Sequence, residues 1–212
     1  MSGDDGFAKD FCVKPRGLLP RRCVSNLTRM NTGEIKRLNW GCGSWTPEGW
    51  INSDIKDEPG VNLVCNILDG GLPLESASID YAVSIHALPE MTYPTLVPIL
   101  QELRRVLKPG AVLRLALPDL DKGIAAYQRG DRDYFLIPDE DAKSPGAKFI
   151  TQMLWYGYSK LLFTRDFIEE MLLKAGFSRV THCTYKQTAS PWPEILDLDN
   201  RENESLFVEA VK

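Results

Sequence analysis

Residues that bind metals are scarce in this sequence, which has two histidines and five cysteines. No two of the cysteines are closely spaced, and neither His86 nor His182 lies in a motif with the spacing of metal ligands. The sequence therefore predicts neither a structural nor a catalytic metal site. An odd number of scattered cysteines is also typical of a reducing compartment rather than of a secreted disulfide framework, so we expect a cytoplasmic protein.

The sequence also lacks a long hydrophobic run and an excess of basic residues. No segment reaches the roughly 18 apolar residues that a membrane span needs. The first residues, MSGDDGFAKDF, are acidic and polar, unlike a secretory signal. The chain carries 25 basic and 29 acidic residues, a net charge of −4 at pH 7, whereas a nucleic-acid-binding surface normally shows a basic stripe. We therefore expect a protein that binds neither a membrane nor a nucleic acid.

The most informative segment that is present covers residues 35–54, IKRLNWGCGSWTPEGWINSD. A short apolar strand leads into a turn with Gly41 and Gly43, and a second short strand ends at Asp54. Glycines lack a Cβ, so the backbone can turn tightly and a ligand can lie against its amides. A carboxylate at the tip of the adjacent strand can accept both hydroxyls of a ribose. The pattern predicts a nucleoside-binding site at the carboxyl edge of a parallel sheet.

A turn that binds a nicotinamide dinucleotide is the alternative. That fingerprint needs a third glycine after two intervening residues and an acid about 20 residues further on. Here the third position is Thr46, and Asp54 comes too early. The loop between the two strands is also too short for the usual crossover helix, so we expect irregular or 3₁₀ backbone around Thr46-Pro47. These departures disfavour the dinucleotide.

Strand and helix patterns alternate along the rest of the chain. Buried strands are predicted at 61–65, 79–85, 111–117, 179–185 and 206–211. Helices are predicted at 96–107 with a stop at Pro109-Gly110, at 120–127, and between Thr164 and Gly176. Strands separated by helices predict one mostly parallel, doubly wound α/β domain over residues 34–212, preceded by an N-terminal arm at 1–33. Residues 130–160, rich in charges and aromatics, are predicted to be an inserted lid or specificity element.

Five motifs in this order resemble the class I S-adenosylmethionine-dependent methyltransferases, and more narrowly the small subfamily whose first two strands are joined by a short loop. The matching segments are LNWGCG at 38–43, GWINSD at 49–54, LPL at 72–74 with IDY at 79–81, LRRVLKPG at 103–110, and LPD at 117–119. The late AGF at 175–177 also fits. The resemblance covers about residues 35–180. It implies a Rossmann-like, seven-stranded, mostly parallel sheet with helices on both faces and an antiparallel last strand, and S-adenosyl-L-methionine as the cofactor.

The resemblance also implies where that cofactor lies. The glycine turn would face its methionine portion, Asp54 its ribose, and Ile55 its adenine ring, and the segment after the fourth strand would lie beside the sulfonium. The implied cofactor-binding residues are Asn39, Gly41, Cys42, Gly43, Asp54, Ile55, Asn66, Ile67, Leu68, His86 and Ala87. The sequence departs from the family in two places: Asn66 stands where Asp is common, and His86-Ala-Leu-Pro-Glu90 replaces the frequent Leu-Glu-His.

His86 is the first candidate for a catalytic residue, because an alcohol or phenol acceptor benefits from a base that titrates near neutral pH. The alternative is that His86 only packs against the cofactor. Asp119 and Glu90 are weaker candidates, and Asp119 is also a plausible helix N-cap. Three aromatic residues are candidates for the acceptor pocket, although core or dimer contacts explain them equally well: Trp155, Tyr156 and Tyr158.

The sequence thus predicts an enzyme that transfers a methyl group from S-adenosylmethionine to an oxygen, or a nitrogen, of a small-molecule acceptor. Oxygen is favoured because of His86. Two other functions stay open: a non-catalytic binding or scaffold protein with the same fold, and aminopropyl transfer from the same cofactor. A homodimer is compatible with the sequence.

Overall fold

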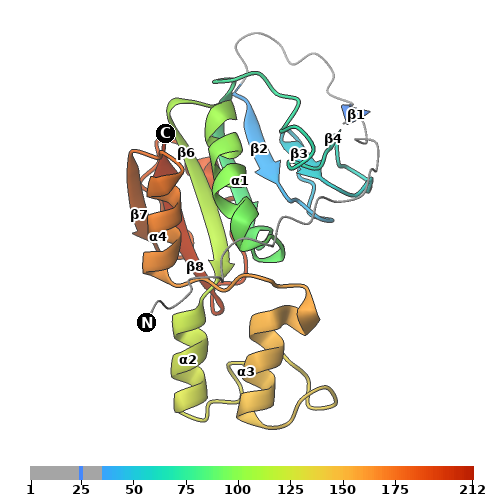
Figure 1. Ribbon diagram of the computed structural model, residues 1–212, viewed down its shortest axis with the longest axis vertical. Helices are drawn as coiled ribbons and strands as arrows, with labels where there is room; N and C mark the ends of the chain where they lie inside the picture. The colour runs from blue at the N-terminus through green and yellow to red at the C-terminus, as the bar shows by residue number, and fades with distance from the viewer. Residues whose placement is uncertain (1–23, 26–34) are drawn as a thin grey trace, which may run out of the picture.

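The computed structural model describes residues 24–25 and 35–212, so the predicted N-terminal arm lies outside the described residues except for Val24 and Ser25 (Figure 1). One sheet runs through the domain. Its strands are β1 Val24–Ser25, β2 Arg37–Trp40, β3 Ile51–Asp54, β4 Leu63–Val64, β5 Ile79–Ile85, β6 Leu107–Pro118, β7 Arg179–Cys183 and β8 Ser205–Val211. The helices are α1 Tyr93–Val106, α2 Leu120–Gln128, α3 Pro145–Leu154 and α4 Arg165–Lys174, with 3₁₀ turns η1 Leu88–Glu90, η2 Trp155–Gly157 and η3 Pro193–Leu196.

The sheet has the order β1-β4-β3-β2-β5-β6-β8-β7. Strands β4, β3, β2, β5 and β6 are parallel, and β8 is antiparallel to both of its neighbours. Strands β2 to β8 therefore confirm the predicted seven-stranded, mostly parallel sheet with an antiparallel last strand. The chain order reverses between β2 and β5, and a crevice is expected outside the carboxyl ends of the strands at such a point.

The two faces of the sheet are covered differently. Helices α1 and α4 pack on one face, as Figure 1 shows, and bury Leu96, Leu100, Ile168 and Leu172 in the main core. Among the described residues, the other face is covered by η3 and the β7–β8 connection rather than by an α-helix. There Ile195 joins a smaller cluster that contains Trp50 and Tyr81.

Most predicted elements are confirmed, with differences at their ends. Strand β5 has the predicted bounds, and the Thr46-Pro47 region is irregular as expected. Helix α1 ends at Val106, one residue before its predicted end, whereas β6 begins at Leu107 and not at the predicted residue 111. Gly110 has a positive φ of 75° inside β6, where the register with β5 shifts between Ile79 and Tyr81. Proline and glycine here mark an irregular strand rather than a helix end.

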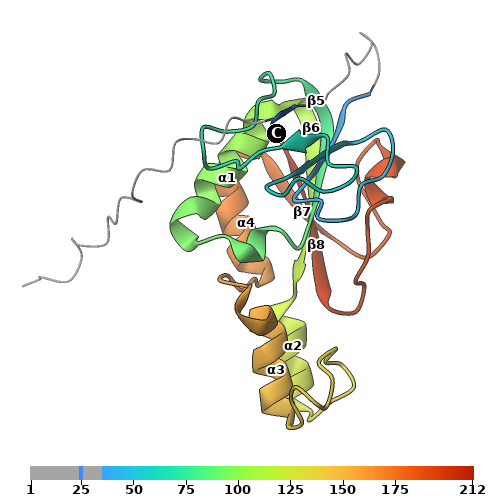
Figure 2. The ribbon, with the colours of Figure 1, turned by 90° about the vertical axis from the view of Figure 1, so that its right-hand side faces the viewer.

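The predicted insertion at 130–160 contains α3 and η2. Helix α3 packs against α2, with the rings of Tyr127 and Phe149 stacked at 5.4 Å, and a Cβ on Gly123 would come within 3.0 Å of Met153. Figures 1 and 2 show the two helices side by side beyond the end of the sheet. We call residues 120–157 the helical hairpin. It forms a separate projection next to the carboxyl ends of the strands.

Two further observations bear on the expected environment of the protein. In the described ranges 24–25 and 35–212, none of the helices has both the length and the hydropathy needed to cross a bilayer. Cys65, directly after β4, is disulfide-bonded, whereas Cys42 and Cys183 are free. This disulfide is contrary to the expectation of a reducing compartment without disulfides, which rested on the absence of closely spaced cysteines in the sequence.

Candidate active site

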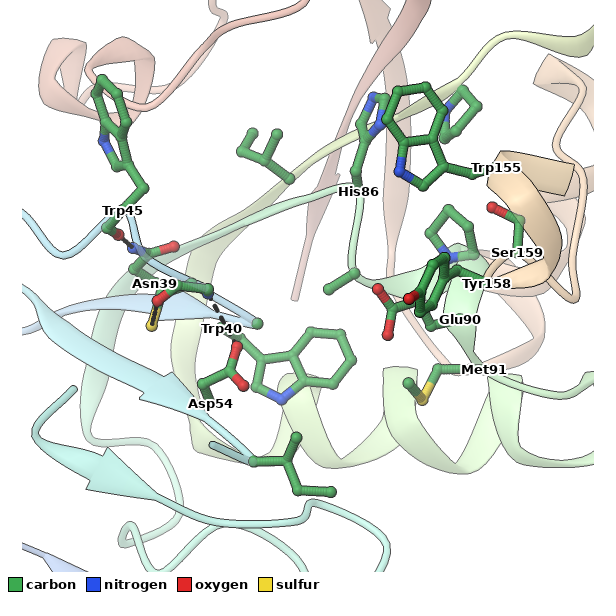
Figure 3. Close-up of a pocket in the computed structure, with 18 of the residues that line it drawn as sticks. Asn39, Trp40, Trp45, Asp54, His86, Glu90, Met91, Trp155, Tyr158 and Ser159 are labelled. Carbon is green, nitrogen blue, oxygen red and sulfur yellow. Dashed lines mark hydrogen bonds between the residues drawn. The ribbon is translucent and has the colours of Figure 1, made fainter. Parts of the chain in front are cut away.

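A cavity of about 510 Å³ lies at the carboxyl ends of β2, β3 and β5 (Figure 3). This volume is in the range of small-molecule sites, roughly 300–1,000 Å³. Its walls come from the glycine turn, the ends of β3 and β4, the β5–η1 segment, the helical hairpin and the β7–β8 connection. The lining residues used below are Asn39, Gly41, Cys42, Gly43, Asp54, Ile55, Asn66, Ile67, His86, Ala87, Glu90, Gln152, Trp155, Tyr158, Asn200, Arg201 and Glu204.

The glycine turn is held against β3 by its own backbone. The amides of Gly41 and Cys42 both donate to the carbonyl of Ser53, at 2.8 and 3.1 Å, and the amide of Gly43 donates to Asp54 Oδ2 at 2.9 Å. Gly41 has a φ of 68°, and a Cβ there would lie 2.3 Å from the Cβ of Ala87. Glycine is therefore required at 41 for contact with the segment after β5. All three amides already donate within the protein, so a ligand that lies against this turn would meet N–H groups that are occupied.

Asp54 joins the turn to the tip of β3. Its Oδ2 accepts from Gly43 and its Oδ1 accepts from the amide of Lys56 at 3.0 Å (Figure 3). A carboxylate oxygen can accept more than one hydrogen bond, so each retains a lone pair for a hydroxyl. A Cβ on Gly43 would have no neighbour within 4 Å, which leaves open space beside this carboxylate. The turn and Asp54 therefore fit the ribose of an adenosyl group.

His86 lies just past β5 with a left-handed φ of 54°, which is uncommon for a residue other than glycine. Its Nε2 is 2.7 Å from the hydroxyl of Ser205. Burial, and next the positive charge of Arg201, lower the pKa of His86 to about 3. The imidazole is therefore neutral at pH 7 and a weak proton acceptor.

The opposite end of the cavity is aromatic and carries a carboxylate. Figure 3 shows Glu90 next to Tyr158, with Trp155 and Ser159 on the same side. Glu90 is exposed, and its carboxylate forms no hydrogen bond or ion pair with the residues that the structure describes. The guanidinium of Arg201 lies 5.6 Å from the Trp155 ring centroid and 2.9 Å from Glu204. An unpaired carboxylate beside aromatic rings suits a positively charged group.

The structure brings most of the sequence-predicted residues to this cavity. The implied cofactor-binding residues all line it except Leu68, which is 47% exposed. Of the three aromatic candidates, Trp155 and Tyr158 line the cavity. Tyr156 does not, and its hydroxyl donates to Asp141 at 2.5 Å.

Asp119 does not line the cavity either. It is 2% exposed, and its Oδ1 accepts from the amide of Lys122 at 3.2 Å as the N-cap of α2. This is the alternative role that the sequence suggested for it. His182, on β7, lies 3.0 Å from Glu169 and away from the cavity.

Sequence reasoning missed several lining residues, above all Gln152 on α3 and Asn200, Arg201 and Glu204 before β8. None of them lies in a recognisable local motif. They reach the cavity because the helical hairpin and the β7–β8 connection meet at one edge of the sheet. No signal in the sequence alone pairs these two segments.

The comparisons with known proteins agree with this geometry. A family model described as a methyltransferase domain matches residues 51–115, from β3 into β6. A S-adenosylmethionine-dependent methyltransferase from Archaeoglobus fulgidus is similar in structure, with 13% identity, a TM-score of 0.50, and 85% of this chain and 87% of that chain covered. No curated protein matches the sequence.

A second similar structure is phosphoethanolamine N-methyltransferase 2 of Haemonchus contortus, crystallised with phosphomonomethylethanolamine and S-adenosylhomocysteine. It has 14% identity and a TM-score of 0.51, with 86% of this chain and 50% of that chain covered. At such identities the two structures establish the shared fold. The chain therefore has the fold of the S-adenosylmethionine-dependent methyltransferases, and a methyltransferase domain is matched over residues 51–115.

Proposed function

We propose that the chain transfers the methyl group of S-adenosylmethionine to a nitrogen atom of a small-molecule amine. One observation carries the proposal: a single cavity joins a glycine turn and carboxylate that fit an adenosyl ribose to an aromatic end with the unpaired carboxylate of Glu90. The first end would hold the cofactor and the second the acceptor.

At the cofactor end, Asp54 would accept the ribose hydroxyls through its remaining lone pairs. Ile55 and Ile67 would pack on the adenine. Asn66 would border the adenine amino group, although its Oδ1 already accepts from the amide of Leu68 at 3.1 Å and would be shared. Gly41, Cys42 and Gly43 would face the methionine portion, and His86 with Ala87 would border the sulfonium.

The choice between nitrogen and oxygen rests on what the acceptor end can do with a proton. S-adenosylmethionine supplies an electrophilic methyl carbon, to which the acceptor's lone pair bonds as the carbon–sulfur bond breaks with its electrons on sulfur. An alcohol needs a base to become a good nucleophile, and His86, with its pKa near 3, is a poor one. A neutral amine already presents a lone pair. Nitrogen therefore replaces the oxygen that the sequence favoured.

Glu90, Trp155 and Tyr158 would receive the amine. Both rings provide contact area, the face of Tyr158 attracts a cation, and the carboxylate attracts the ammonium form from solvent, while the Trp155 ring already carries the guanidinium of Arg201. Because Glu90 is exposed, a proton released from the ammonium can pass to water. The helical hairpin, which supplies Trp155 and the residues next to it, would then act as the specificity element.

Tyramine tests the choice of atom, because it carries a primary amine and a phenol in one molecule. The protein is incubated with S-adenosylmethionine that carries a deuterated methyl group, and the product is examined by mass spectrometry and NMR. Methylation at nitrogen is expected, and a methoxy product would refute the proposal. Aliphatic amines and simple phenols of similar size extend the comparison.

Calorimetric titration with S-adenosylhomocysteine tests the cofactor end separately. Asp54→Asn should lower the affinity about 10- to 100-fold, because hydrogen bonds to a charged group contribute about 1.5–3 kcal/mol. Asp57→Asn, which changes an exposed acid three residues away, is the matched control and should leave the affinity unchanged.

A further inference from the structure

Gln152, on α3, is buried, and the NH₂ group of its side-chain amide has no hydrogen-bond partner. Gln152 is one of the residues that line the cavity, and it is 4% exposed. Its Oε1 accepts from the backbone amide of Leu136 at 2.6 Å. Its Nε2 has no hydrogen-bond partner.

The contact with Leu136 fixes which way the amide points. A backbone N–H can only donate, so the atom facing it must be the Gln152 oxygen. The two N–H groups of Nε2 are therefore directed away from Leu136. The hydrogen bond from Leu136 alone therefore determines which end of the amide is oxygen and which is nitrogen.

A buried donor without a partner is unfavourable, and most such groups in folded proteins are hydrogen-bonded. Among the residues that the structure describes, buried side-chain atoms without a partner belong to eight residues, and only Gln152 and Asn200 of these line the cavity. Asn200 comes from the β7–β8 connection, next to Asp199, which is buried in an ion pair with Arg114. Two amides without full partners therefore meet the same cavity from different segments.

The position of Gln152 ties it to the acceptor rather than to the cofactor. The implied cofactor contacts come from the glycine turn and the ends of β3, β4 and β5, whereas Gln152 lies on the helical hairpin with Trp155. The acceptor end already presents Glu90 to a positive charge. An N–H donor that lines the same cavity calls for an oxygen on the same ligand.

We propose that Gln152 determines acceptor specificity by donating its Nε2 hydrogens to a carbonyl-type oxygen of the acceptor. The acceptor is then an amine that also carries a carboxamide, ester or carboxylate oxygen. This inference rests on the proposed function, since it names the class of molecule bound at the acceptor end of that site.

The test uses two probes that differ only in this oxygen-bearing group, phenylalaninamide and 2-phenylethylamine. Both carry an ammonium and a phenyl ring, and only the first carries a carboxamide. Affinities are measured on the full chain saturated with S-adenosylhomocysteine.

The sequence has four glutamines, so ¹⁵N-glutamine labelling gives four side-chain nitrogen signals, from Gln101, Gln128, Gln152 and Gln187. The signal that disappears in Gln152→Glu is assigned to Gln152.

Gln152→Glu is the informative variant, because it keeps an oxygen that accepts from Leu136, removes the N–H donors and adds a negative charge that still attracts an ammonium group. Wild type should bind phenylalaninamide at least about tenfold more tightly than 2-phenylethylamine, as expected for one hydrogen bond to a buried donor. The Gln152 side-chain signal should shift with the first probe and stay in place with the second. In Gln152→Glu the preference should fall below about threefold, while both cations still bind.

Gln152→Met serves as the control for structure, because it also removes the acceptor for Leu136. If it lowers the melting temperature and Gln152→Glu does not, the specificity effect is separated from the folding of the helical hairpin. Equal affinities in wild type, an unmoved Gln152 signal, or no binding of either probe to protein that binds S-adenosylhomocysteine would overturn the inference. Loss of S-adenosylhomocysteine binding by the wild type would instead overturn the proposed function itself.

Discussion

The two ends of the cavity are built in different ways. The cofactor end is formed largely by residues 39–67, in which backbone hydrogen bonds and a positive φ at Gly41 determine the shape. The acceptor end gathers side chains from three connections that are far apart in sequence, at 86–91, 152–159 and 198–204. One end depends on local backbone geometry and the other on long-range packing.

This difference explains what each end can be used for. A turn fixed by short-range hydrogen bonds presents the same shape whatever the rest of the chain does, which suits a cofactor common to many enzymes. Side chains on connections can change without altering the sheet, which suits an acceptor that differs from one enzyme to the next. The two ends should therefore respond separately to mutation.

The largest effect is expected at the buried anchor of the β7–β8 connection. Arg114 on β6 bonds Asp199 through two nitrogens, at 2.7 and 2.6 Å, and Glu209 at 2.7 Å, with all three side chains buried. Arg114→Met leaves two carboxylates buried without their cation and should lower the free energy of unfolding by about 3–5 kcal/mol. Urea unfolding measures this loss. S-adenosylhomocysteine affinity should change less than about threefold in protein that remains folded, since the cofactor end does not use this anchor.

Two further variants sharpen that measurement. Arg132→Met removes the exposed pair with Asp139 and should cost no more than about 1 kcal/mol. Adding Asp199→Asn and Glu209→Gln to Arg114→Met should recover part of the stability, because the uncompensated charges are then gone. If Arg114→Met proves no more costly than Arg132→Met, the buried ions do not hold the connection in place.

The second effect concerns the glycine turn. Gly41→Ala places a methyl group 2.3 Å from the Cβ of Ala87 and forces a φ of 68° on a residue that disfavours it. We expect S-adenosylhomocysteine affinity to fall about 100-fold, equivalent to roughly 3 kcal/mol. Gly43→Ala shares the positive φ without the clash and should lose much less. Isothermal titration calorimetry with S-adenosylhomocysteine compares the affinities of the two variants. A double variant with Ala87→Gly should regain part of the affinity lost by Gly41→Ala.

The same contrast accounts for how much could be predicted from the sequence. Strand β5 and the glycine turn are local patterns, so continuous apolar residues and the Gly-X-Gly spacing were sufficient to find them. Arg114 lies in the middle of the apolar run AVLRLAL, and the pattern predicted its strand correctly without showing that the charge is paired inside the protein. Its partners are 85 and 95 residues away. Such pairings depend on which distant segments come into contact, and the local spacing of residues does not predict these contacts.

The acceptor end shows the same limit more strongly. The sequence predicted an inserted lid or specificity element at 130–160 and drew attention to its aromatic residues. It did not show that α3 would pack on α2, or that Arg201 would lie over Trp155. It assigned His86 a pKa suited to catalysis, whereas burial and Arg201 lower it to about 3. A residue type indicates what chemistry is available, and its surroundings determine whether it operates at pH 7.

The third effect is the pH dependence that His86 gives to stability. The unfolded chain binds a proton on His86 below about pH 6.5, while the folded protein keeps the imidazole neutral down to about pH 3. The free energy of unfolding is therefore unaffected by His86 well above pH 6.5. It decreases as the pH falls through 6.5, and the decrease due to His86 reaches about 2 kcal/mol at pH 5. Asn tolerates a left-handed φ, so His86→Asn is a suitable control that does not titrate. The difference in unfolding free energy between the two proteins should shift by this amount between pH 7.5 and pH 5. An identical loss in both would show that His86 is solvated.

The smallest effect tests whether Arg201 acts on His86 from across the cavity. Arg201→Met with Glu204→Gln removes both members of the 2.9 Å pair, so no buried charge is left alone. The pKa of His86 should rise, because the positive charge that helps to lower it is gone. The chain has only two histidines, so the signal of His86 is readily assigned in an NMR titration. Arg201→Lys keeps the charge and changes the geometry of the contacts with Trp155 and Glu204; the contact with the ring contributes about 0.5–1 kcal/mol at an exposed site. In that variant the pKa of His86 should stay low. A pKa that is the same in all three proteins would mean that burial alone determines the titration of His86 and that the β7–β8 connection does not act on it.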